Sequence, residues 1–348
     1  MKKSIIIMLG LALMSVQSFA DTRAQALLLH NGQGKSFDAN QLQEAVNEAV
    51  DGDTIYLSEG TFVTGKNNDD TLIVEKAVSI IGTGETTKLA GYVNIAIDGN
   101  PISNGLEFGR MHITKDLVVI KKMHGLKVSQ CFIDGYFTAT DTITGIKMDR
   151  CFARTFTPTQ YIRSATVTNS IFTCIGSFYN DPKKAVYFNS YGCDLLFMNC
   201  NIYQISVYEP ALTTTGGHVG DATFVNCMID HIYNWDYRQE ANIYTNCLLR
   251  GTFASGNTVT NCYNNSNFKI EYDVKNSYFI VCKLNNQEVN SEMLRDNGYI
   301  GTDGSVVGAL GGATPFSMQA DGLRVKESVL RVDPDTRQLN VTLKVEKQ

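Results

Sequence analysis

The chain has 348 residues, of which 30 are Lys or Arg and 35 are Asp or Glu, giving a formal net charge of −5. This mildly acidic balance, without a basic run, argues against nucleic acid as a partner, because phosphate neutralisation needs clustered Lys and Arg. The length would ordinarily predict two domains. Abundant Gly, Asn, Thr, Val, Ile, Phe and Tyr instead favour β-structure in a repeat architecture that grows along one axis.

Residues 1–20 have the pattern of a cleavable export signal. Lys2 and Lys3 precede a short apolar run, and Ser18 and Ala20 supply the small residues at −3 and −1 of a cleavage site. Removing this segment takes away two lysines and no acids, so the formal charge moves from −5 to −7. No cysteine follows the cleavage point to carry a lipid, and no later segment is long and apolar enough to span a bilayer. We therefore predict a secreted or periplasmic protein without an integral membrane segment.

Residues 21–50 are expected to form an N-terminal segment that ends in a capping helix. Asp38 and Gln41 have the spacing of a capping box. The apolar residues of the helix fall on one face, namely Leu42, Ala45, Val46, Ala49 and Val50. Such a helix would cover the open end of a β-repeat, whose free edges otherwise invite aggregation.

A repeat runs through the middle of the chain. Eight copies carry a small residue at position zero: Cys131, Cys151, Ser170, Cys200, Cys227, Cys247, Cys262 and Ser277. Position −1 is Asn in six of them: Asn169, Asn199, Asn226, Asn246, Asn261 and Asn276. Position −3 is apolar in every copy, and position +2 is apolar in every copy except the one that holds Asn264.

This pattern predicts stacked layers of short strands. Each copy has the alternation of two strands joined at a corner, and one copy cannot bury its apolar face alone. Stacking in parallel would turn position −1 into a ladder of asparagines, each amide donating to the next, because Asn tolerates the left-handed backbone of a sharp corner. The copies are 20, 19, 30, 27, 20, 15 and 15 residues apart. Layers of about twenty residues suit a three-sided all-β solenoid, with loops in the two long intervals.

The C-terminal part of the chain leaves the repeat. Residues 303–316 are rich in glycine. Beyond residue 318, alternating stretches at 328–332 and 339–345 flank the turn sequence Asp-Pro-Asp-Thr. We predict that residues 319–348 form a β-hairpin, either as a cap over the last layer or as a small accessory element.

The helix followed by G-D-T-I-Y-L at 52–57 and G-T-F at 60–62 resembles the opening of the pectate-lyase-like β-helix superfamily, and the N-C-x-I copies resemble its later coils. The glycine-rich exit is similar to that of secreted bacterial β-helix proteins of unassigned function. The resemblance covers roughly residues 36–318. It implies a single-stranded right-handed parallel β-helix over residues 51–318.

The nine cysteines are an odd number, and most of them fall at position zero. Ser replaces Cys there in two copies, which is typical of a small buried residue. Stacked parallel side chains seldom reach the torsion of a disulfide, and no C-x-x-C pair marks a metal site. We therefore expect mostly free thiols and no metal.

The superfamily often acts on acidic polysaccharides, yet its catalytic signatures do not match this chain. The polygalacturonase order fails, because the acids at 69–70 come too early and the sequence at 217–220 is G-H-V-G. Calcium-dependent pectate lyases need several acids beside an Arg or Lys base, and no such cluster is present. No cofactor is assigned: Ca²⁺ is compatible with the function, but no clear acidic cluster marks a site for it.

A different set of residues predicts glycan binding. Nine residues before position zero, four successive copies carry Tyr161, Tyr191, His218 and Arg238, which equal offsets would stack in one stripe. The nearby loops add Lys183, Lys184, Trp235, Asp236 and Tyr237. Sugar faces stack on aromatic rings, and carboxylates or sulfates pair with Arg and Lys.

These residues give two hypotheses. The first is a secreted protein that interacts with an anionic polysaccharide, with a lyase chemistry in which His218 or Tyr237 is the base and Arg238 or Lys184 the clamp. Tyr161, Tyr191, Lys183, Trp235 and Asp236 would then contact the sugar. The alternative is a non-catalytic carbohydrate-binding or adhesive surface scaffold, because every catalytic signature fails and a fold does not imply a function.

Overall fold

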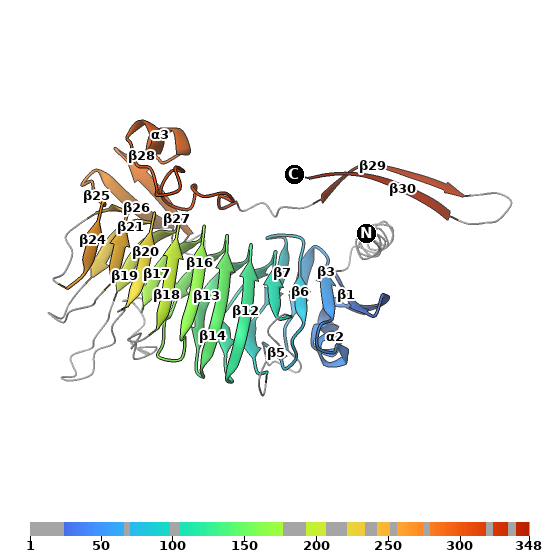
Figure 1. Ribbon diagram of the computed structural model, residues 1–348. Helices are drawn as coiled ribbons and strands as arrows, with labels where there is room; N and C mark the ends of the chain where they lie inside the picture. Colours follow the sequence, from blue (N-terminus) through green and yellow to red (C-terminus); the bar gives the residue numbers. More distant parts are fainter. Residues whose placement is uncertain are drawn as a thin grey trace.

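The computed structural model describes residues 24–65, 70–97, 105–176, 193–206, 221–233, 242–250, 256–273, 279–317, 323–332 and 339–347. Within them the chain is all-β, and two large sheets hold most of the strands (Figure 1). As the chain advances, it alternates between the two sheets and adds a strand to each in turn. This arrangement is compatible with a solenoid, and one strand from each sheet is called a layer.

The first sheet has twelve strands. In spatial order they are β2 (Gln33–Asp38), β1 (Gln25–His30), β3 (Thr54–Leu57), β6 (Ser79–Ile81), β9 (Glu107–Gly109), β12 (Met123–Ser129), β14 (Ile143–Asp149), β16 (Ser164–Thr168), β18 (Asp194–Met198), β20 (Ala222–Val225), β22 (Ile243–Thr245) and β24 (Thr258–Thr260). From β3 onward all neighbours are parallel.

The second sheet has thirteen strands. Its main path is β4 (Gly60–Val63), β7 (Thr87–Ala90), β10 (His112–Ile113), β13 (Phe132–Ala139), β15 (Phe152–Phe156), β17 (Ile171–Gly176), β19 (Asn201–Ser206), β21 (Met228–Tyr233), β23 (Leu248–Leu249) and β25 (Tyr263–Asn264), with a branch of β5 (Thr71–Val74), β8 (Tyr92–Ile95) and β11 (Leu117–Val119) that joins β13. All of its pairs are parallel.

The repeat keeps register from layer to layer. At position −3, the strands of the first sheet place Phe197 opposite Phe224 and Phe224 opposite Tyr244. Their rings stack nearly parallel, with centroids 5.1 Å and 5.0 Å apart, and all three are fully buried. Equal offsets in the chain therefore become neighbours in space, and their apolar side chains form one continuous core between the sheets.

The corner at position −1 has the left-handed backbone that the asparagines predict. Its φ angle lies between 49° and 55° at Gln130, Arg150, Asn169, Asn199, Asn226, Asn246 and Asn261. Non-glycine residues rarely adopt this conformation, and Asn is among those that tolerate it best. The backbone N–H groups of Asn199, Asn226 and Asn246 each donate to a backbone carbonyl of the next layer at 3.0 Å. Asn276 lies outside the described residues.

Position zero shows why Cys and Ser replace one another. The thiol of Cys151 donates to the carbonyl of Asp149 at 3.3 Å, two residues earlier, and the hydroxyl of Ser170 donates to Thr168 at 2.7 Å. Both side chains therefore satisfy the same carbonyl position behind the corner. All nine cysteines are free thiols in this structure. Burial raises the pKa of the Cys227 and Cys247 thiols well above the ordinary value, so they stay protonated.

The N-terminal end of the stack is covered by local structure. The 3₁₀ helix η1 (Ala39–Gln41) leads into α2 (Leu42–Glu48), and the helix packs against β1, β2 and β5. The Gln41 side chain accepts a hydrogen bond from the Asp38 N–H at 3.2 Å, as in the predicted capping box. Leu42, Ala45 and Val46 are buried.

The parallel stacks end at β24 and β25, which differs from the prediction. The copy expected at Ser277 does not continue them: Phe279 lies in β27 (Phe279–Leu284), which runs antiparallel between β26 (Phe268–Asp273) and β28 (Gln287–Glu288). The polar Asn264 at position +2 marks this change, because a layer without an apolar residue there cannot extend the core.

A second core lies on the outer face of the second sheet. Position +1 carries large apolar residues that point away from the main core, namely Phe132, Phe152, Ile171, Met228 and Leu248. They pack against side chains of β26, β27 and the helix α3 (Ser291–Asp296). The antiparallel sheet and α3 therefore cover one outer face of the stack.

Residues 299–317 run back along the asparagine corner toward earlier layers. Asn226 Oδ1 accepts from the Thr302 N–H at 3.0 Å, Asn201 Oδ1 accepts from Ala309 at 2.9 Å, and Asn169 Nδ2 donates to Gly311 at 2.6 Å. At Gly308 the φ angle is 81°, and a Cβ would lie 2.5 Å from Asn201 Oδ1, so only glycine fits this close approach. The corner amides thus hold a strap formed by the glycine-rich exit.

The last strands form a separate ribbon. β29 (Leu323–Val332) and β30 (Leu339–Lys347) pair antiparallel with each other, in a two-stranded sheet of their own. Figure 1 shows this ribbon extending beyond the N-terminal layers, at the opposite end from β24 and β25. The ribbon therefore lies away from the last layer of the stack. A cap over that layer was one of the two arrangements expected from the sequence.

Candidate ligand-binding surface

Most of the predicted site residues lie outside the part of the chain that the structure describes. They are Lys183, Lys184, Tyr191, His218, Trp235, Asp236, Tyr237 and Arg238. Tyr161 is described, at the turn before β16. Its carbonyl accepts from the Ile143 N–H at 2.8 Å, and its partly buried side chain packs against the main core. The geometry around Tyr161 therefore points to a packing role.

The strands that precede the other predicted residues in the chain are neighbours in the second sheet. Residues 177–192, 207–220 and 234–241 follow directly after β17, β19 and β21 and lie outside the described residues. The last residues of these strands, Gly176, Ser206 and Tyr233, are register neighbours. The ends of the three strands therefore lie side by side.

Three partly exposed aromatic rings lie together on the outer side of the second sheet, two of them on its strands β19 and β21 and one on β26 of the antiparallel sheet. Tyr203 of β19 meets His231 of β21 edge to face, with ring centroids 5.2 Å apart. Tyr272 of β26 packs against Tyr203 from the other side at 4.8 Å. Edge-to-face contacts of this kind are favourable and keep the rings in fixed orientations. The cluster Tyr203–His231–Tyr272 is therefore a rigid, partly exposed aromatic surface.

A buried carboxylate holds a cation beside these rings. Asp230 is fully buried, and it accepts from Arg250 Nη1 at 3.1 Å and from the Ile270 N–H at 2.5 Å. The Arg250 side chain is 39% exposed, so part of it faces solvent. A buried charge is tolerated only when it is paired and hydrogen-bonded, as Asp230 is. Asp230 thus fixes Arg250 and ties the antiparallel sheet to the stack.

His231 has an altered ionisation. Burial lowers its pKa below 6.5, outweighing the carboxylate of Asp230, whose Oδ1 lies 3.5 Å from His231 Nε2, and Arg250 lowers it further. At pH 7 the imidazole is therefore mainly neutral. Neutral imidazole can accept a proton, which makes His231 the best-placed base among the described residues of this surface.

This shift predicts a pH dependence. Because the unfolded chain binds a proton at His231 more readily than the folded chain, stability falls as pH drops through and below 6.5. We expect the thermal midpoint of a His231→Gln variant to fall less between pH 7.5 and 5.5 than that of the parent chain. Parallel thermal melts at the two pH values measure this, and equal decreases in both proteins would contradict it.

The sequence contains a signal for this surface, at a different position from the predicted stripe nine residues before position zero. Tyr203, Asp230 and Arg250 all lie at position +3 of successive copies, and His231 follows Asp230. Two other described histidines also have a partner: His112 Nε2 lies 2.9 Å from Asp134, and His124 Nδ1 lies 2.6 Å from the Thr144 hydroxyl.

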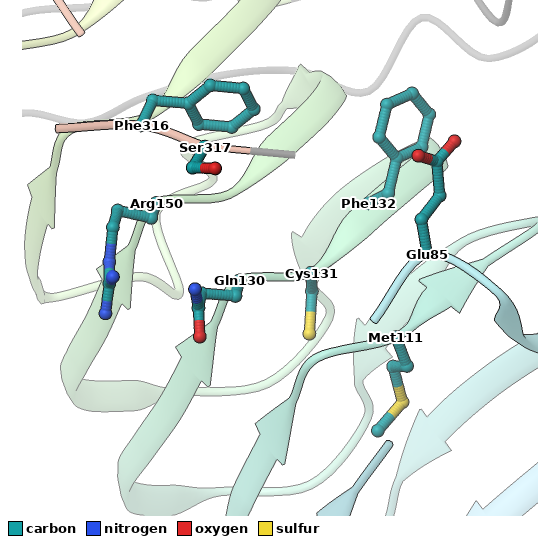
Figure 2. A pocket seen from close by; sticks show the side chains of 8 residues that line it. All are labelled: Glu85, Met111, Gln130, Cys131, Phe132, Arg150, Phe316 and Ser317. Carbon is teal, nitrogen blue, oxygen red and sulfur yellow. The ribbon is translucent and has the colours of Figure 1, made fainter. Parts of the chain in front are cut away.

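A shallow hollow is the second candidate (Figure 2). It is lined by Glu85, Met111, Gln130, Cys131, Phe132, Arg150, Phe316 and Ser317. Gln130 and Arg150 occupy the corner position that asparagines hold elsewhere, and the strap ends above them. Arg150 Nε is paired with Asp149 at 2.9 Å, and the Cys131 thiol donates to the Phe108 carbonyl at 3.4 Å. The hollow therefore combines one paired cation with the amide of Gln130, whose Nε2 is buried without a hydrogen-bond partner among the described residues.

Metal ligands do not gather in the part of the chain that the structure describes, where no group of three or more His, Cys, Asp or Glu side chains could hold an ion. Asp70 is paired with Lys115 at 2.7 Å. No helix among these residues is both long and apolar enough to cross a bilayer. Comparison of the chain with models of protein families, with curated proteins and with solved structures found no match.

Proposed function

We propose that this protein is an exported right-handed parallel β-helix of the pectate-lyase-like kind that binds an anionic glycan. The parallel register of both sheets supports the fold, because parallel strands of one sheet joined by crossover connections are nearly always right-handed. The signal-like segment at residues 1–20 supports export. The two sheets provide a rigid frame on which residues at the same repeat position lie next to each other in successive layers.

The observation that carries the glycan proposal is the aromatic cluster Tyr203–His231–Tyr272 beside Arg250. Rings bind the apolar faces of sugars, and a guanidinium pairs with carboxylate or sulfate. In the chain, the predicted residues Trp235 and Arg238 follow β21, which carries His231, and Lys184 follows β17, which is the neighbour of β19. Fixed rings with one anchored cation fit a polysaccharide that carries regularly spaced negative charges.

The test is binding of the mature chain to a panel of uronate-containing and sulfated polysaccharides, measured by affinity electrophoresis and calorimetry. We expect Tyr272→Ala to weaken binding about three- to tenfold, which corresponds to one lost aromatic contact. Trp235→Ala and Arg238→Ala test the predicted stripe in the same way. Lys127→Ala is the control, because Lys127 lies on β12 of the first sheet and its exposed side chain pairs with Glu107 of β9, whereas the aromatic cluster lies on the second sheet and β26. Equal affinity of the Tyr272→Ala variant and the parent chain for every glycan would remove the aromatic surface from the proposal.

A polysaccharide lyase is the second candidate, favoured by the mainly neutral His231 beside Arg250. In such a reaction a base removes the proton α to the uronate carboxylate, and a cation stabilises the resulting enolate. The ultraviolet absorbance of the unsaturated product measures it, with His231→Gln and His218→Gln compared. Retained binding without any product would refute the lyase and leave a non-catalytic carbohydrate-binding or adhesive scaffold.

A further inference from the structure

The hollow drawn in Figure 2 lies on the asparagine corner, at the end of the strap. Figure 2 shows Phe132 and Glu85 on one side of it and Phe316 and Ser317 of the strap on the other. Gln130, at position −1 of its layer, lies below them. The Glu85 side chain is exposed. The hollow therefore has two aromatic walls, a carboxylate at its rim and one side-chain amide at its base.

The amide of Gln130 is suited to bind a carbonyl oxygen. Its Nε2 is buried and has no hydrogen-bond partner among the described residues. A buried donor without an acceptor is costly, and a ligand that supplies the acceptor removes this cost. Asn169 holds the same position in another layer, and its Nδ2 donates to the backbone carbonyl of Gly311 at 2.6 Å. An amide carbonyl is thus a known acceptor for the side chains of this corner.

The surroundings of Gln130 differ from those that hold the strap. There, Asn201 at position +1 accepts from the Ala309 N–H at 2.9 Å, so the corner offers both a donor and an acceptor to a peptide backbone. In the layer of Gln130, position +1 is the aromatic ring of Phe132. Rings pack on the apolar faces of sugars. One amide donor between the rings of Phe132 and Phe316 therefore fits a sugar that carries an amide better than it fits an extended peptide.

The charges of the hollow favour an uncharged ligand with hydrogen-bond donors. Glu85 forms no ion pair within the part of the chain that the structure describes. Arg150, the cation among the lining residues, is paired with Asp149 at 2.9 Å. The carboxylate of Glu85 repels an anionic group and accepts from an N–H or a hydroxyl.

We propose that the hollow binds the acetamido group of an N-acetylated amino sugar. The acetamido carbonyl accepts from Gln130 Nε2, and the sugar ring packs between Phe132 and Phe316. The amide N–H or a sugar hydroxyl donates to Glu85. This site goes beyond the anionic-glycan proposal, because it needs no charge on the sugar and uses none of the residues of the aromatic cluster.

Saturation-transfer NMR and calorimetry on the mature chain test this proposal. N-acetylglucosamine and N-acetylgalactosamine are compared with glucose and galactose, which keep the ring but lack the acetamido group. We expect the acetylated sugars to bind at least about tenfold more tightly, because the buried donor gains an acceptor and the acetamido group adds packed surface. Equal binding of acetylated and plain sugars would overturn the proposal. So would a capped glycine, acetyl-glycine-amide, that binds as tightly as the acetylated sugars, because the amide alone would then be recognised.

Gln130→Asn tests the assigned donor. Asn holds this corner in other layers and tolerates the left-handed backbone of Gln130, whose φ is 51°, so we expect the fold to be kept. The shorter side chain withdraws the donor, and binding of the acetylated sugars should weaken about three- to tenfold, as for one lost hydrogen bond. Gln287→Asn is the matched control, because it makes the same change at an exposed position of β28.

Glu85→Ala gives a second variant at an exposed position, where the fold is least affected. We expect it to weaken binding of the acetylated sugars by a similar factor, because an acceptor for their N–H or hydroxyl is lost. Circular dichroism checks the fold of each variant. Parent-like affinity for the acetylated sugars in both Gln130→Asn and Glu85→Ala would show that they bind elsewhere and would overturn the proposal.

Discussion

We expect Phe224→Ala to lower the free energy of unfolding by about 3–5 kcal/mol, the usual cost of removing a buried aromatic side chain. Phe224 is fully buried, and its ring stacks between Phe197 and Tyr244 at 5.1 Å and 5.0 Å. The rigid backbone of two parallel sheets on either side limits how far the site can collapse, so most of the cavity remains. Because the three residues lie in successive layers, the loss interrupts the aromatic column two layers before the end of the first sheet.

Urea unfolding followed by circular dichroism measures this effect. Val259→Ala is the control, because Val259 occupies the same position −3 but is 42% exposed. We expect its free energy of unfolding to change by less than about 1 kcal/mol, since an exposed side chain loses little burial. Stacked layers can unfold in steps, so the slopes of the two transitions are compared as well as the midpoints. Similar losses in the two variants would show that the column is not the main source of stability.

The repeat made much of the layered arrangement predictable. The apolar residues at −3 and +2, the small residue at zero and the Asn at −1 all follow from strand alternation and a tight corner. An earlier layer was missed because Met111 stands at position zero in place of Cys or Ser. Arg110 has the same left-handed corner, with φ of 56°, and Phe108 and Ile113 occupy the buried positions. A pattern defined by one small residue cannot detect a layer that tolerates a larger one.

The outer core and the strap were not predictable from the repeat alone. The apolar residues at position +1, such as Phe152 and Met228, gave a signal that the outer face is covered. What covers it comes from residues 268–317, where the repeat pattern around Ser277 does not mark a further layer. Their placement depends on long-range contacts, such as Asn169 with Gly311, that local patterning does not specify.

The candidate site was harder to predict because offsets lose meaning away from the corner. Register between β13 and β15 shifts after Ile133, so that Tyr136 lies opposite Thr155. One extra residue moves every later side chain along the strand. Position +3 lies only three residues from position zero, with Asp230 in β21 and Arg250 directly after β23. Residues nine positions before position zero lie in connections whose length varies from layer to layer. The same offset in the sequence therefore does not ensure the same position in space.

The second large effect is expected at Asp230. Asp230→Ala leaves the buried Ile270 N–H without its acceptor and Arg250 without its carboxylate. Removing one partner of a buried pair usually costs 3–5 kcal/mol. Because Arg250 is 39% exposed, water compensates part of the loss, and we expect about 2–4 kcal/mol. The acceptor for Ile270 cannot be replaced by water as easily, because Ile270 is buried.

This loss should be local, because Asp230 connects β21 of the stack to β26 of the antiparallel sheet. Hydrogen exchange should show faster exchange of the β26 amides in Asp230→Ala, while the amides of the layers around Phe224 stay protected. Glu271→Ala is the control: its exposed carboxylate pairs with Lys269 and Lys283 on the same antiparallel sheet and faces water, so exchange in β26 should change little. Uniformly faster exchange across all layers would mean that the antiparallel sheet and the stack unfold as one unit, because losing the Asp230 contacts would then destabilise both together.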